Sequence, residues 1–409
     1  MMTTMTPTIR PSAPTVGRTY LRLAIAGGGT GGHIQPGLHL LENLRARKEA
    51  PFELKELLWF GTGRSVEDRA FAGLPELLEG AAFERASLTL EPAGGGAPSL
   101  RGLSLRVLPA VQAARKKLKQ HQSDVVLGLG GFTCLPVILA ARSLGIPTAL
   151  LEINAVRGRA TRWLAPLVKR VFHAWPSTLP QGRTRSARDC WTGPPLASRF
   201  HSGRPSSEQS LACRAQLGFD PKRPLLVMLG GSQGAGGINE FASKYASVFV
   251  DAGVQVFLQA GPGKLDRRLD GVPGFKTVEY VRDVADLLTA ADLVLCRGGA
   301  STLAELCGLA RPGVVVPYPH HADQHQAVNA AQLGAGVRLV LEPDLSQETA
   351  FELCQLTSQS GTATRDSMCV ALKGRFPYER PGDQILDELL RISRVGMGGP
   401  LLPENTAVQ

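Results

Sequence analysis

The sequence of 409 residues is poor in several features that would each point to a class of protein. Aromatic residues make up 6% of it, too few to suggest the stacking surfaces that bind single-stranded nucleic acid. Its 7 cysteines are scattered and form no CxxC pair, which argues against a disulfide framework and a zinc site. The longest nearly uncharged run, 125–141, is interrupted by glycines and a proline and is too short to span a membrane. We therefore expect no nucleic-acid partner, no metal and no cofactor.

Length and charge set the broad expectations. A chain of 409 residues exceeds the usual size of one hydrophobic core, so two domains are expected. The composition, with 43% hydrophobic and 20% charged residues, is that of a globular protein. The net charge of +10 favours an anionic partner such as a phosphate or an anionic lipid. Residues 1–20 are rich in Thr and Pro and contain no apolar run of signal-peptide length, so we interpret them as a flexible leader.

Short apolar runs alternate with helical patterns along the chain, and the alternation starts again in the second half. The first half is predicted to contain helices at 35–48 and 135–144 and strands at 21–26, 54–60, 124–129 and 148–152. The second half is predicted to contain strands at 224–229, 254–259, 293–296 and 313–317. Such alternation predicts an α/β protein with two doubly wound, Rossmann-like parallel sheets.

Domain limits follow from the same pattern. We expect an N-terminal domain over 21–196 and a C-terminal domain over 197–375, with the boundary near 194–200. Residues 376–393 are predicted to form a C-terminal helical segment that can return to the N-terminal domain. Residues 394–409, which contain Gly and Pro, are interpreted as a loose tail.

Three glycine-rich turns follow predicted strands and precede predicted helices, where open α/β sheets bind ligands. They read GGGTGGHIQPG at 27–37, GGSQGAGGINE at 230–240 and CRGGASTLAELCG at 296–308. Bare backbone N–H groups beside a helix N-terminus suit a diphosphate. The first turn has the G-x-G-x-x-G spacing of dinucleotide folds, but no acid ends the second strand to hold a ribose, which disfavours that interpretation. For the second turn, a plain strand-to-helix connection is an equal alternative.

Polar groups in these segments are candidates for ligand contacts. The N–H groups of Ala300, Ser301 and Thr302 would lie in the first turn of a helix and point outward. Glu305, one turn further on, could accept two ribose hydroxyls; alternatively it only complements the helix dipole. In the following loop, Gln326 and its neighbours suit the hydroxyls of a sugar. A metal site in that loop is the less favoured alternative, with the candidate ligands His320, His321, Asp323 and His325.

Taken in order, these turns and the segments between them resemble the MurG family of N-acetylglucosaminyltransferases, which make lipid II in bacterial cell-wall synthesis. The matching segments extend from about residue 21 to 392 and include WFGTGRSVEDRA, LGLGGFTCLPVILAA, LEINAVRGRATRWLA and PYPHHADQHQAVNA. The resemblance implies a GT-B fold whose two domains face a cleft. It also implies a UDP-N-acetylglucosamine donor, a polyprenyl-diphosphate-linked muramyl pentapeptide acceptor, and inverting transfer to the C4 hydroxyl of the muramyl unit.

The resemblance further implies roles for individual residues. Donor binding is assigned to Ser232, Ala300, Ser301, Thr302, Glu305, His325 and Gln326. Acceptor binding is assigned to Thr30, Gly31, Gly32 and Asn154. The catalytic base is His33 or, as second candidate, Glu152, although His33 can instead hold the acceptor diphosphate. The helix N-terminus after the third turn would stabilise the leaving diphosphate without a metal.

The sequence departs from the family pattern at three places. Phe132 stands where a Tyr is usual, Ala155 where a Gly is usual, and Ala197 where the hinge normally has an Arg. Arg199 could replace that Arg only with a shift of two positions. These departures keep two alternatives open, namely another lipid-directed GT-B transferase and a catalytically inactive nucleotide-sugar-binding protein.

The basic residues are unevenly spread. No acid occurs in 92–123 or in 153–188, while both segments carry several Lys and Arg. Anionic headgroups attract such patches by about 1 kcal/mol per basic residue near the surface. We expect the N-terminal half to bind an anionic membrane surface, as a peripheral protein on the cytoplasmic face of the plasma membrane. A solvated basic face, or weak RNA binding, is the alternative.

Overall fold

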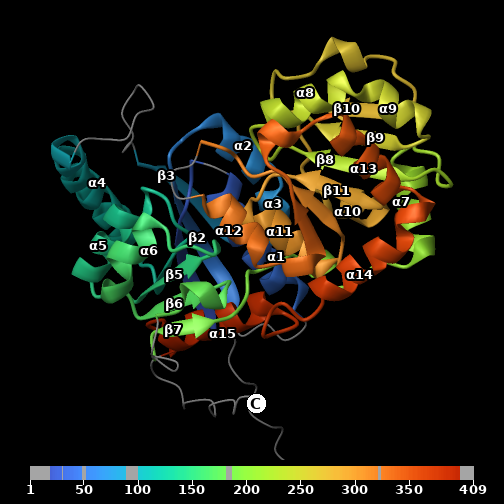
Figure 1. Cartoon of the computed structure of the whole chain (residues 1–409). Coiled ribbons are helices and arrows are strands. Elements are labelled where there is room, and N and C mark those ends of the chain that lie inside the picture. The colour runs from blue at the N-terminus through green and yellow to red at the C-terminus, as the bar shows by residue number, and fades with distance from the viewer. Residues whose placement is uncertain are drawn as a thin grey trace, which may run out of the picture.

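The computed structural model describes residues 19–29, 31–47, 52–88, 100–180, 187–320 and 324–396 of the chain. Within these ranges the chain forms two parallel β-sheets, each flanked by helices (Figure 1). We call the seven-stranded sheet with its helices the N-terminal half, and the six-stranded sheet with its helices the C-terminal half. The predicted α/β class with two doubly wound parallel sheets is therefore confirmed.

The N-terminal sheet has the strand order β3-β2-β1-β4-β5-β6-β7, and its neighbouring strands are parallel. The strands are β1 (Tyr20–Ala26), β2 (Glu53–Gly61), β3 (Ala82–Ser87), β4 (Val125–Gly128), β5 (Thr148–Glu152), β6 (Arg170–His173) and β7 (Asp189–Trp191). The helices are α1 (Gln35–Ala46), α2 (Ser65–Phe71), α3 (Leu74–Leu78), α4 (Leu100–His121), α5 (Cys134–Ser143) and α6 (Arg159–Leu164). The strand order reverses between β1 and β4, which opens a crevice at their carboxyl ends.

The C-terminal sheet has the order β10-β9-β8-β11-β12-β13 and is also parallel. Its strands are β8 (Leu225–Leu229), β9 (Gln255–Gln259), β10 (Phe275–Val278), β11 (Leu293–Cys296), β12 (Gly313–Val315) and β13 (Val337–Leu339). The helices are α7 (Ser207–Gln216), α8 (Gly236–Lys244), α9 (Ala246–Asp251), α10 (Ala285–Ala290), α11 (Ala300–Gly308), α12 (His325–Ala331), α13 (Gln347–Thr357) and α14 (Thr362–Leu372). Here the order reverses between β8 and β11, so the second and third glycine-rich turns meet at this crevice.

Burial explains why the central strands have uninterrupted apolar sequences. β4, β8 and β11 are buried along their whole length because helices cover both faces of a parallel sheet. The edge strands β3 and β13 are largely exposed and mix charged with apolar residues. Among the described residues, no helix is both long and apolar enough to cross a membrane.

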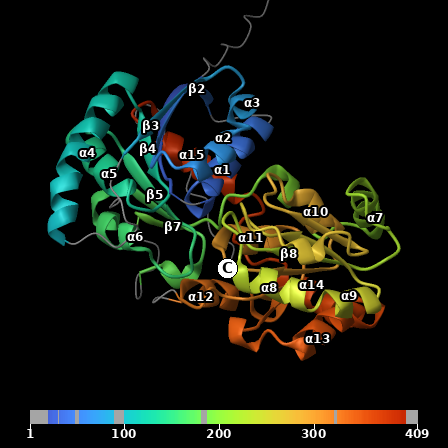
Figure 2. The same ribbon diagram turned by 90° about the horizontal axis from the view of Figure 1, so that it is seen from above.

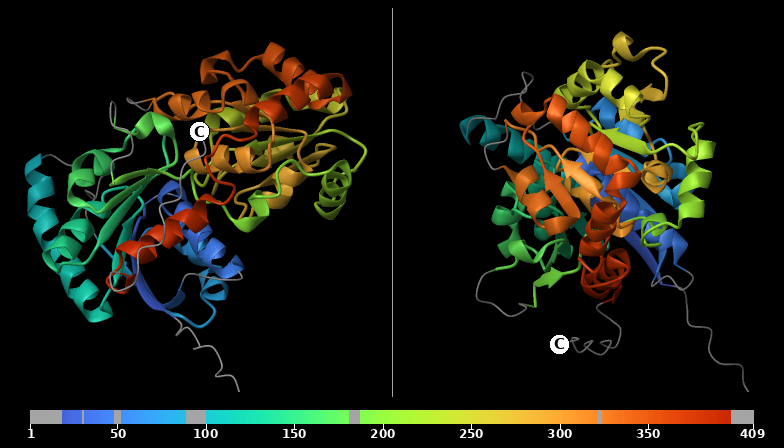
Figure 3. Two further views of the ribbon diagram at one scale, coloured as in Figure 1. Left: turned by 90° about the horizontal axis from the view of Figure 1, so that it is seen from below. Right: turned by 45° about the vertical axis from the view of Figure 1, so that its right-hand side comes forward.

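The last helix, α15 (Pro381–Ile392), lies against the N-terminal half, beside α1 in Figure 2 and in red in Figure 3. Its apolar face is buried in the N-terminal core through Ile385, Leu386, Leu389 and Ile392. On its other side, Asp387 pairs with Arg47 at 2.7 Å. The chain therefore crosses back to its first half before it ends, while the exact domain limits at 196 and 375 stay predictions.

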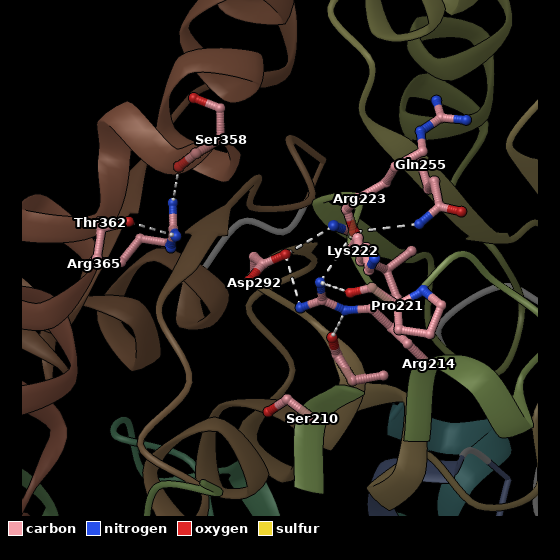
Figure 4. Close-up of polar contacts among 12 residues, drawn as sticks. Ser210, Arg214, Pro221, Lys222, Arg223, Gln255, Asp292, Ser358, Thr362 and Arg365 are labelled. Atoms are coloured by element: carbon pink, nitrogen blue, oxygen red, sulfur yellow. Dashed lines mark hydrogen bonds and ion pairs between the residues drawn. The ribbon is translucent and has the colours of Figure 1, made fainter. Parts of the chain in front are cut away.

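One buried guanidinium joins the amino ends of two central strands in the C-terminal half (Figure 4). Arg214 of α7 pairs with Asp292 at 2.8 Å and donates to the carbonyl of Ala290 at 2.8 Å. The Asp292 carboxylate also accepts from the backbone N–H of Leu225, where β8 begins. Because a buried charge is unfavourable unless it is paired and hydrogen-bonded, this network fixes how α7, β8 and β11 meet. The carboxyl ends of the same strands are left to the glycine-rich turns.

Candidate active site

A cavity of about 690 Å³ lies between the two halves, at the carboxyl ends of both sheets. Its volume is within the range of small-molecule sites. Residues of all three glycine-rich turns line it, joined by Gln35 and His39 of α1 and by Arg199 and Phe200 of the hinge. The sequence-predicted residues in its wall are Gly31, Gly32, Ser232, Ala300, Ser301, Thr302, Glu305 and Gln326. The structure thus brings members of the predicted donor and acceptor sets together; Thr30 lies outside the described residues.

The first turn is held from behind by Glu67, a residue to which the sequence analysis gave no role. Its buried carboxylate accepts from the N–H groups of Gly29, Thr62 and Gly63 at 2.8, 2.8 and 3.0 Å. The Thr62 hydroxyl and the Arg85 guanidinium donate to it as well, at 2.7 and 2.6 Å. Burial alone would raise the pKa of this carboxyl, but these hydrogen bonds outweigh it and lower the pKa.

Glu67 also packs closely against two glycines, one after β1 and one at the end of β2. A Cβ atom on Gly28 would lie 2.5 Å from Oε1 of Glu67, and one on Gly61 would lie 2.4 Å from Oε2. With Glu67 in this place, glycine is therefore required at both positions.

His33 follows the first turn and packs against the turn after β4. Its ring lies over Gly130 and Gly131, whose positive φ angles of 102° and 76° suit glycine. Burial is the main reason why the pKa of His33 is lowered, and the nearby His325 of the C-terminal half lowers it further. A hydrogen bond to the backbone of Gly28 acts in the opposite direction. The imidazole is therefore neutral near pH 7, the state that a general base requires.

Glu152 ends β5, yet it is not part of the cavity wall. Its buried carboxylate accepts from the backbone N–H groups of Asn154 and Gly158 at 3.1 and 2.8 Å and from the Thr161 hydroxyl at 2.6 Å. These donors hold the loop between β5 and α6 in place. A role of Glu152 as catalytic base stays a prediction, and its surroundings favour positioning of that loop instead.

Asn154 connects this loop to the C-terminal half. Its side-chain oxygen accepts from Asn329 of α12 at 3.2 Å, and Asn329 in turn accepts from the backbone N–H of Ala155 at 2.7 Å. Asn329 also donates to the carbonyl of Gly298, in the third glycine-rich turn, at 3.1 Å. One fully buried amide therefore joins the predicted acceptor loop to the predicted donor turn.

The second turn faces the first across the cavity. A Cβ atom added to Gly31 would lie 3.2 Å from the hydroxyl oxygen of Ser232, so the two turns are in close contact here. Gly234 has a φ of 70°, and a Cβ atom there would lie 1.8 Å from the carbonyl oxygen of Ala260. Ser232 and the residues on both sides of it, Gly231 and Gln233, therefore line the cavity.

The third turn begins α11 and gives the cavity a helix N-terminus. The side-chain oxygen of Ser301 is buried and has no hydrogen-bond partner among the described residues. Gln326 reaches the turn from α12, and its side-chain oxygen accepts from the N–H groups of Gly298 and Tyr318 at 3.2 and 2.9 Å. This leaves its NH₂ group as the donor for a ligand in the cavity. His321 and Asp323 lie outside the described residues.

Glu305 lies one turn into α11 and is 5% exposed, with its side chain in the cavity wall. None of the described residues donates a hydrogen bond to its carboxyl, and Nε2 of His39 lies 3.9 Å from Oε1. Burial raises the pKa of Glu305 to about 8, and the positive charge of Arg199 opposes this rise. A buried acid that lacks donors is expected to bind a ligand that supplies them.

Arg199 lies in the cavity wall, but its charge is already paired with both halves. Its guanidinium contacts Glu42 of α1 at 2.9 Å and Asp283 of the C-terminal half at 3.1 Å. Ala197, where the family pattern has an Arg, is fully buried and lacks any polar group. Arg199 therefore connects the two halves at the hinge. That it takes over the role of the family's hinge Arg stays a prediction.

Comparison with known families shows two matches that together span most of the chain. Residues 23–173 match the glycosyltransferase family 28 N-terminal domain. Residues 225–349 match the glycosyltransferase family 28 C-terminal domain. The match boundaries leave the hinge and α7 between them.

Two curated relatives carry the name UDP-N-acetylglucosamine–N-acetylmuramyl-(pentapeptide) pyrophosphoryl-undecaprenol N-acetylglucosamine transferase. The protein of Halorhodospira halophila is 36% identical over 335 residues, which is 80% of this chain and 86% of the relative. The protein of Sorangium cellulosum is 36% identical over 383 residues, 90% of this chain and 88% of the relative. Among solved structures, Acinetobacter baumannii MurG has a TM-score of 0.63 at 22% identity and covers 91% of this chain and 99% of its own, a likeness in fold.

Proposed function

Because the chain belongs to glycosyltransferase family 28, we propose that it transfers N-acetylglucosamine from UDP-N-acetylglucosamine to the C4 hydroxyl of a lipid-linked N-acetylmuramyl pentapeptide, the step from lipid I to lipid II of peptidoglycan synthesis. The observation that carries the donor site is Glu305, a buried carboxyl in the cavity wall with no hydrogen-bond donor among the described residues. The vicinal hydroxyls of a ribose are the donors that it lacks.

The remaining donor contacts follow from the third turn. The first N–H groups of α11, at Ala300, Ser301 and Thr302, have no partner within the helix and lie in the cavity wall, so they suit the diphosphate. The unsatisfied Ser301 hydroxyl supports this assignment. Gln326, with its NH₂ group toward the cavity, and the adjacent His325 are assigned to the sugar. As the bond to UDP breaks, the helix N-terminus stabilises the charge on the leaving diphosphate.

The acceptor is assigned to the N-terminal side of the cavity. The backbone of Gly31 and Gly32, in the cavity wall, would contact its diphosphate. Thr30, outside the described residues, is assigned to the acceptor as well, and Asn154 is assigned to its sugar. Ser232, facing Gly31, serves the nucleotide. In this arrangement the acceptor and the donor meet where the first two turns approach each other.

His33 is assigned as the base of a single displacement. The C4 hydroxyl attacks the anomeric carbon from the face opposite to UDP, the bond to the diphosphate breaks, and the configuration inverts. The proton of the hydroxyl passes to a ring nitrogen of His33, which is neutral because burial lowers its pKa. Glu152 supports this step through the Asn154 loop that it holds.

The test is transfer of radiolabelled N-acetylglucosamine from its UDP donor to purified muramyl-pentapeptide polyprenyl diphosphate. Labelled lipid is expected from the unchanged protein. His33→Ala should lower kcat by roughly 100-fold to 10,000-fold, the usual contribution of a general base, while calorimetry gives an unchanged Kd for UDP-N-acetylglucosamine. No labelled lipid from protein that binds this donor would overturn the proposed acceptor and favour another lipid or an inactive nucleotide-sugar-binding protein.

We further propose that the N-terminal half is the membrane-facing side, on the cytoplasmic face of the plasma membrane. Helices α4, α5 and α6 pack together against one face of its sheet. Leu108 of α4 and Trp163 of α6 are exposed, as is Phe132 in the turn before α5. Lys116 and Lys119 of α4 are exposed basic residues on this side. An apolar side chain in the headgroup region and a basic patch beside it are complementary signals for binding an anionic bilayer.

Vesicle flotation tests this membrane assignment. The protein should float with phosphatidylglycerol vesicles and much less with phosphatidylcholine vesicles. Lys116→Glu together with Lys119→Glu should reduce the bound fraction several-fold, and 0.5 M salt should do the same. Lys222→Glu together with Lys373→Glu, at two exposed positions of the C-terminal half, makes the same change in charge and should leave flotation unchanged. Equal binding of the double variant would contradict the assignment.

A further inference from the structure

His39 extends from α1 of the N-terminal half toward Glu305 of the C-terminal half. Nε2 of His39 is 3.9 Å from Oε1 of Glu305, and both side chains are in the cavity wall. The two residues are 1% and 5% exposed, so the contact is shielded from bulk water. The residue that would contact a ribose therefore has a titratable neighbour supplied by the opposite half of the molecule.

The hydrogen bonds of His39 determine which nitrogen can accept a proton. Nδ1 lies 3.3 Å from the carbonyl oxygen of Pro195 in the hinge, and a carbonyl can only accept, so Nδ1 carries the hydrogen. Nε2 then bears the lone pair of the neutral ring, and the side-chain amide of Gln35 lies 2.9 Å from it. Gln35 is half-buried in the cavity wall, and its amide can present either NH₂ or oxygen. The same surroundings therefore accommodate both neutral and protonated His39.

We propose that His39 is a positioning residue of the donor site, which takes the proton of Glu305 when a ribose enters, so that Glu305 binds the two ribose hydroxyls as a carboxylate. The proposal rests on the donor site proposed above. The O–H bond of Glu305 breaks and an N–H bond forms at Nε2 of His39, with no other reactant. The pair holds one proton before and after the step, so its net charge stays zero. Gln35 turns its amide oxygen toward the new N–H.

The charges around the pair explain why the proton lies on Glu305 until a ligand arrives. Burial raises the pKa of Glu305 to about 8 and lowers the pKa of His39 to about 3. Ionised Glu305 becomes favourable once two hydroxyls donate to it and the positive charge of the imidazolium lies beside it, because hydrogen bonds to a charged group are the strong ones. The other titratable or charged groups facing the pair are Glu42, Arg199, His201, Asp283 and Cys296.

Calorimetric titration with UDP-N-acetylglucosamine between pH 6 and pH 9 tests the proposal, because the diphosphate of this probe has no proton that titrates in this range. Its Kd for the unchanged protein should stay within about threefold between pH 6 and pH 7.5, where the pair holds its proton with and without ligand. In His39→Gln the proton of Glu305 must leave for solvent on binding. Its affinity should match the unchanged protein near pH 9 and weaken by about tenfold per pH unit below pH 8.

A purely structural role of His39 predicts a different result, namely weakening by the same factor at every pH. Parallel pH profiles for the unchanged protein and His39→Gln would therefore overturn the proposal. Glu305→Gln should bind weakly with a flat profile, and adding His39→Gln to it should not restore a slope. If the unchanged protein binds no UDP-N-acetylglucosamine at any pH, the proposed function fails instead.

A measurement on the unchanged protein covers the case in which His39→Gln does not fold. The heat of binding at pH 7 is measured in phosphate and in Tris, whose ionisation enthalpies differ, and the difference counts the protons released. The proposal expects no net release. Release of about one proton per bound donor would show that Glu305 loses its proton to solvent and would overturn the role of His39.

Discussion

Two buried glutamates, one in each half, have opposite surroundings. Glu152 accepts hydrogen bonds from Asn154, Gly158 and Thr161. Glu305 is about as deeply buried, yet no described residue donates to it. Glu152 is the last residue of β5 and Glu305 lies in α11, the helix after β11, so both are near the carboxyl end of a buried strand. The two glutamates differ in the number of hydrogen-bond donors that contact their carboxyl groups.

The comparison teaches how to separate a structural acid from a binding one. A carboxylate whose lone pairs are all occupied holds its own loop and has little to offer a ligand. A carboxyl with no donor is destabilised in its ionised form until a ligand provides hydroxyl groups. Four predictions test this contrast, from the largest expected free-energy change to the smallest.

The first prediction concerns the pH dependence of stability. Burial raises the pKa of Glu305 to about 8, so the unchanged protein loses stability relative to Glu305→Gln as pH rises from about 4.5 to 8. Between pH 5 and pH 8.5 the loss should be about 4 kcal/mol, because nearly three pKa units of the shift fall in this interval and each corresponds to about 1.4 kcal/mol. Urea unfolding of both proteins at pH 5 and pH 8.5 measures it. If the stability difference between the unchanged protein and Glu305→Gln were the same at both pH values, the pKa of Glu305 would not be raised in the folded protein.

The second prediction concerns the donors around Glu152. Glu152→Ala leaves two backbone N–H groups and the Thr161 hydroxyl without their acceptor, and should lower the free energy of unfolding by about 3 kcal/mol. Donor affinity should be unchanged because Glu152 is outside the cavity wall. Urea unfolding and calorimetry give the two numbers. Glu352→Ala, at an exposed position of α13, is the control and should alter neither. If Glu152→Ala bound UDP-N-acetylglucosamine more weakly, the contrast between a structural Glu152 and a ligand-binding Glu305 would be wrong.

The third prediction sharpens the role of Glu305 in binding. Glu305→Gln should weaken the Kd for UDP by about 10-fold to 100-fold, because an amide can accept from one ribose hydroxyl but no longer carries a charge. The same variant should bind 2′-deoxy-UDP almost as well as UDP. Calorimetry at pH 8.5, where the carboxyl is largely ionised, gives both constants. If the ratio of the Kd for 2′-deoxy-UDP to the Kd for UDP were the same in Glu305→Gln as in the unchanged protein, Glu305 would not bind the ribose.

The fourth prediction concerns the smallest group. The Ser301 hydroxyl is buried and has no partner among the described residues, so Ser301→Ala should leave the free energy of unfolding within about 0.5 kcal/mol. Its affinity for UDP should fall about fivefold, the equivalent of one neutral hydrogen bond of about 1 kcal/mol. Thermal melting with and without UDP measures both. A large change in stability without ligand would instead indicate a structural role.

Much of the fold was predictable because the central strands are buried on both faces. The runs at 148–152 and 293–296 agree with β5 and β11 to the residue, since apolar stretches between polar turns have few other interpretations. β3, β6, β7, β10 and β13 were missed because each is short and carries no long apolar run. They are strands because a neighbouring strand offers hydrogen bonds, which a single sequence does not reveal.

The candidate site was predictable only in part, for a similar reason. Residues within glycine-rich motifs, such as Ser301 and Glu305, can be predicted as ligand contacts from their spacing within the motif. Glu67 and His39 act across long sequence separations, the first on Gly29 and the second on Glu305. His39 did leave one signal, a titratable residue between the buried leucines of α1, which indicates a polar partner outside the helix. Which partner it has depends on how the two halves meet.

The return of α15 to the N-terminal half has a consequence for how the protein is made. During synthesis the seven-stranded sheet leaves the ribosome first, but the helix that completes its core emerges only after the whole six-stranded sheet. The usual order, in which the first domain is finished before the second appears, is therefore not open to this chain. A stop codon shortly before α15 would expose apolar surface on the half made first, while the half made last remained covered.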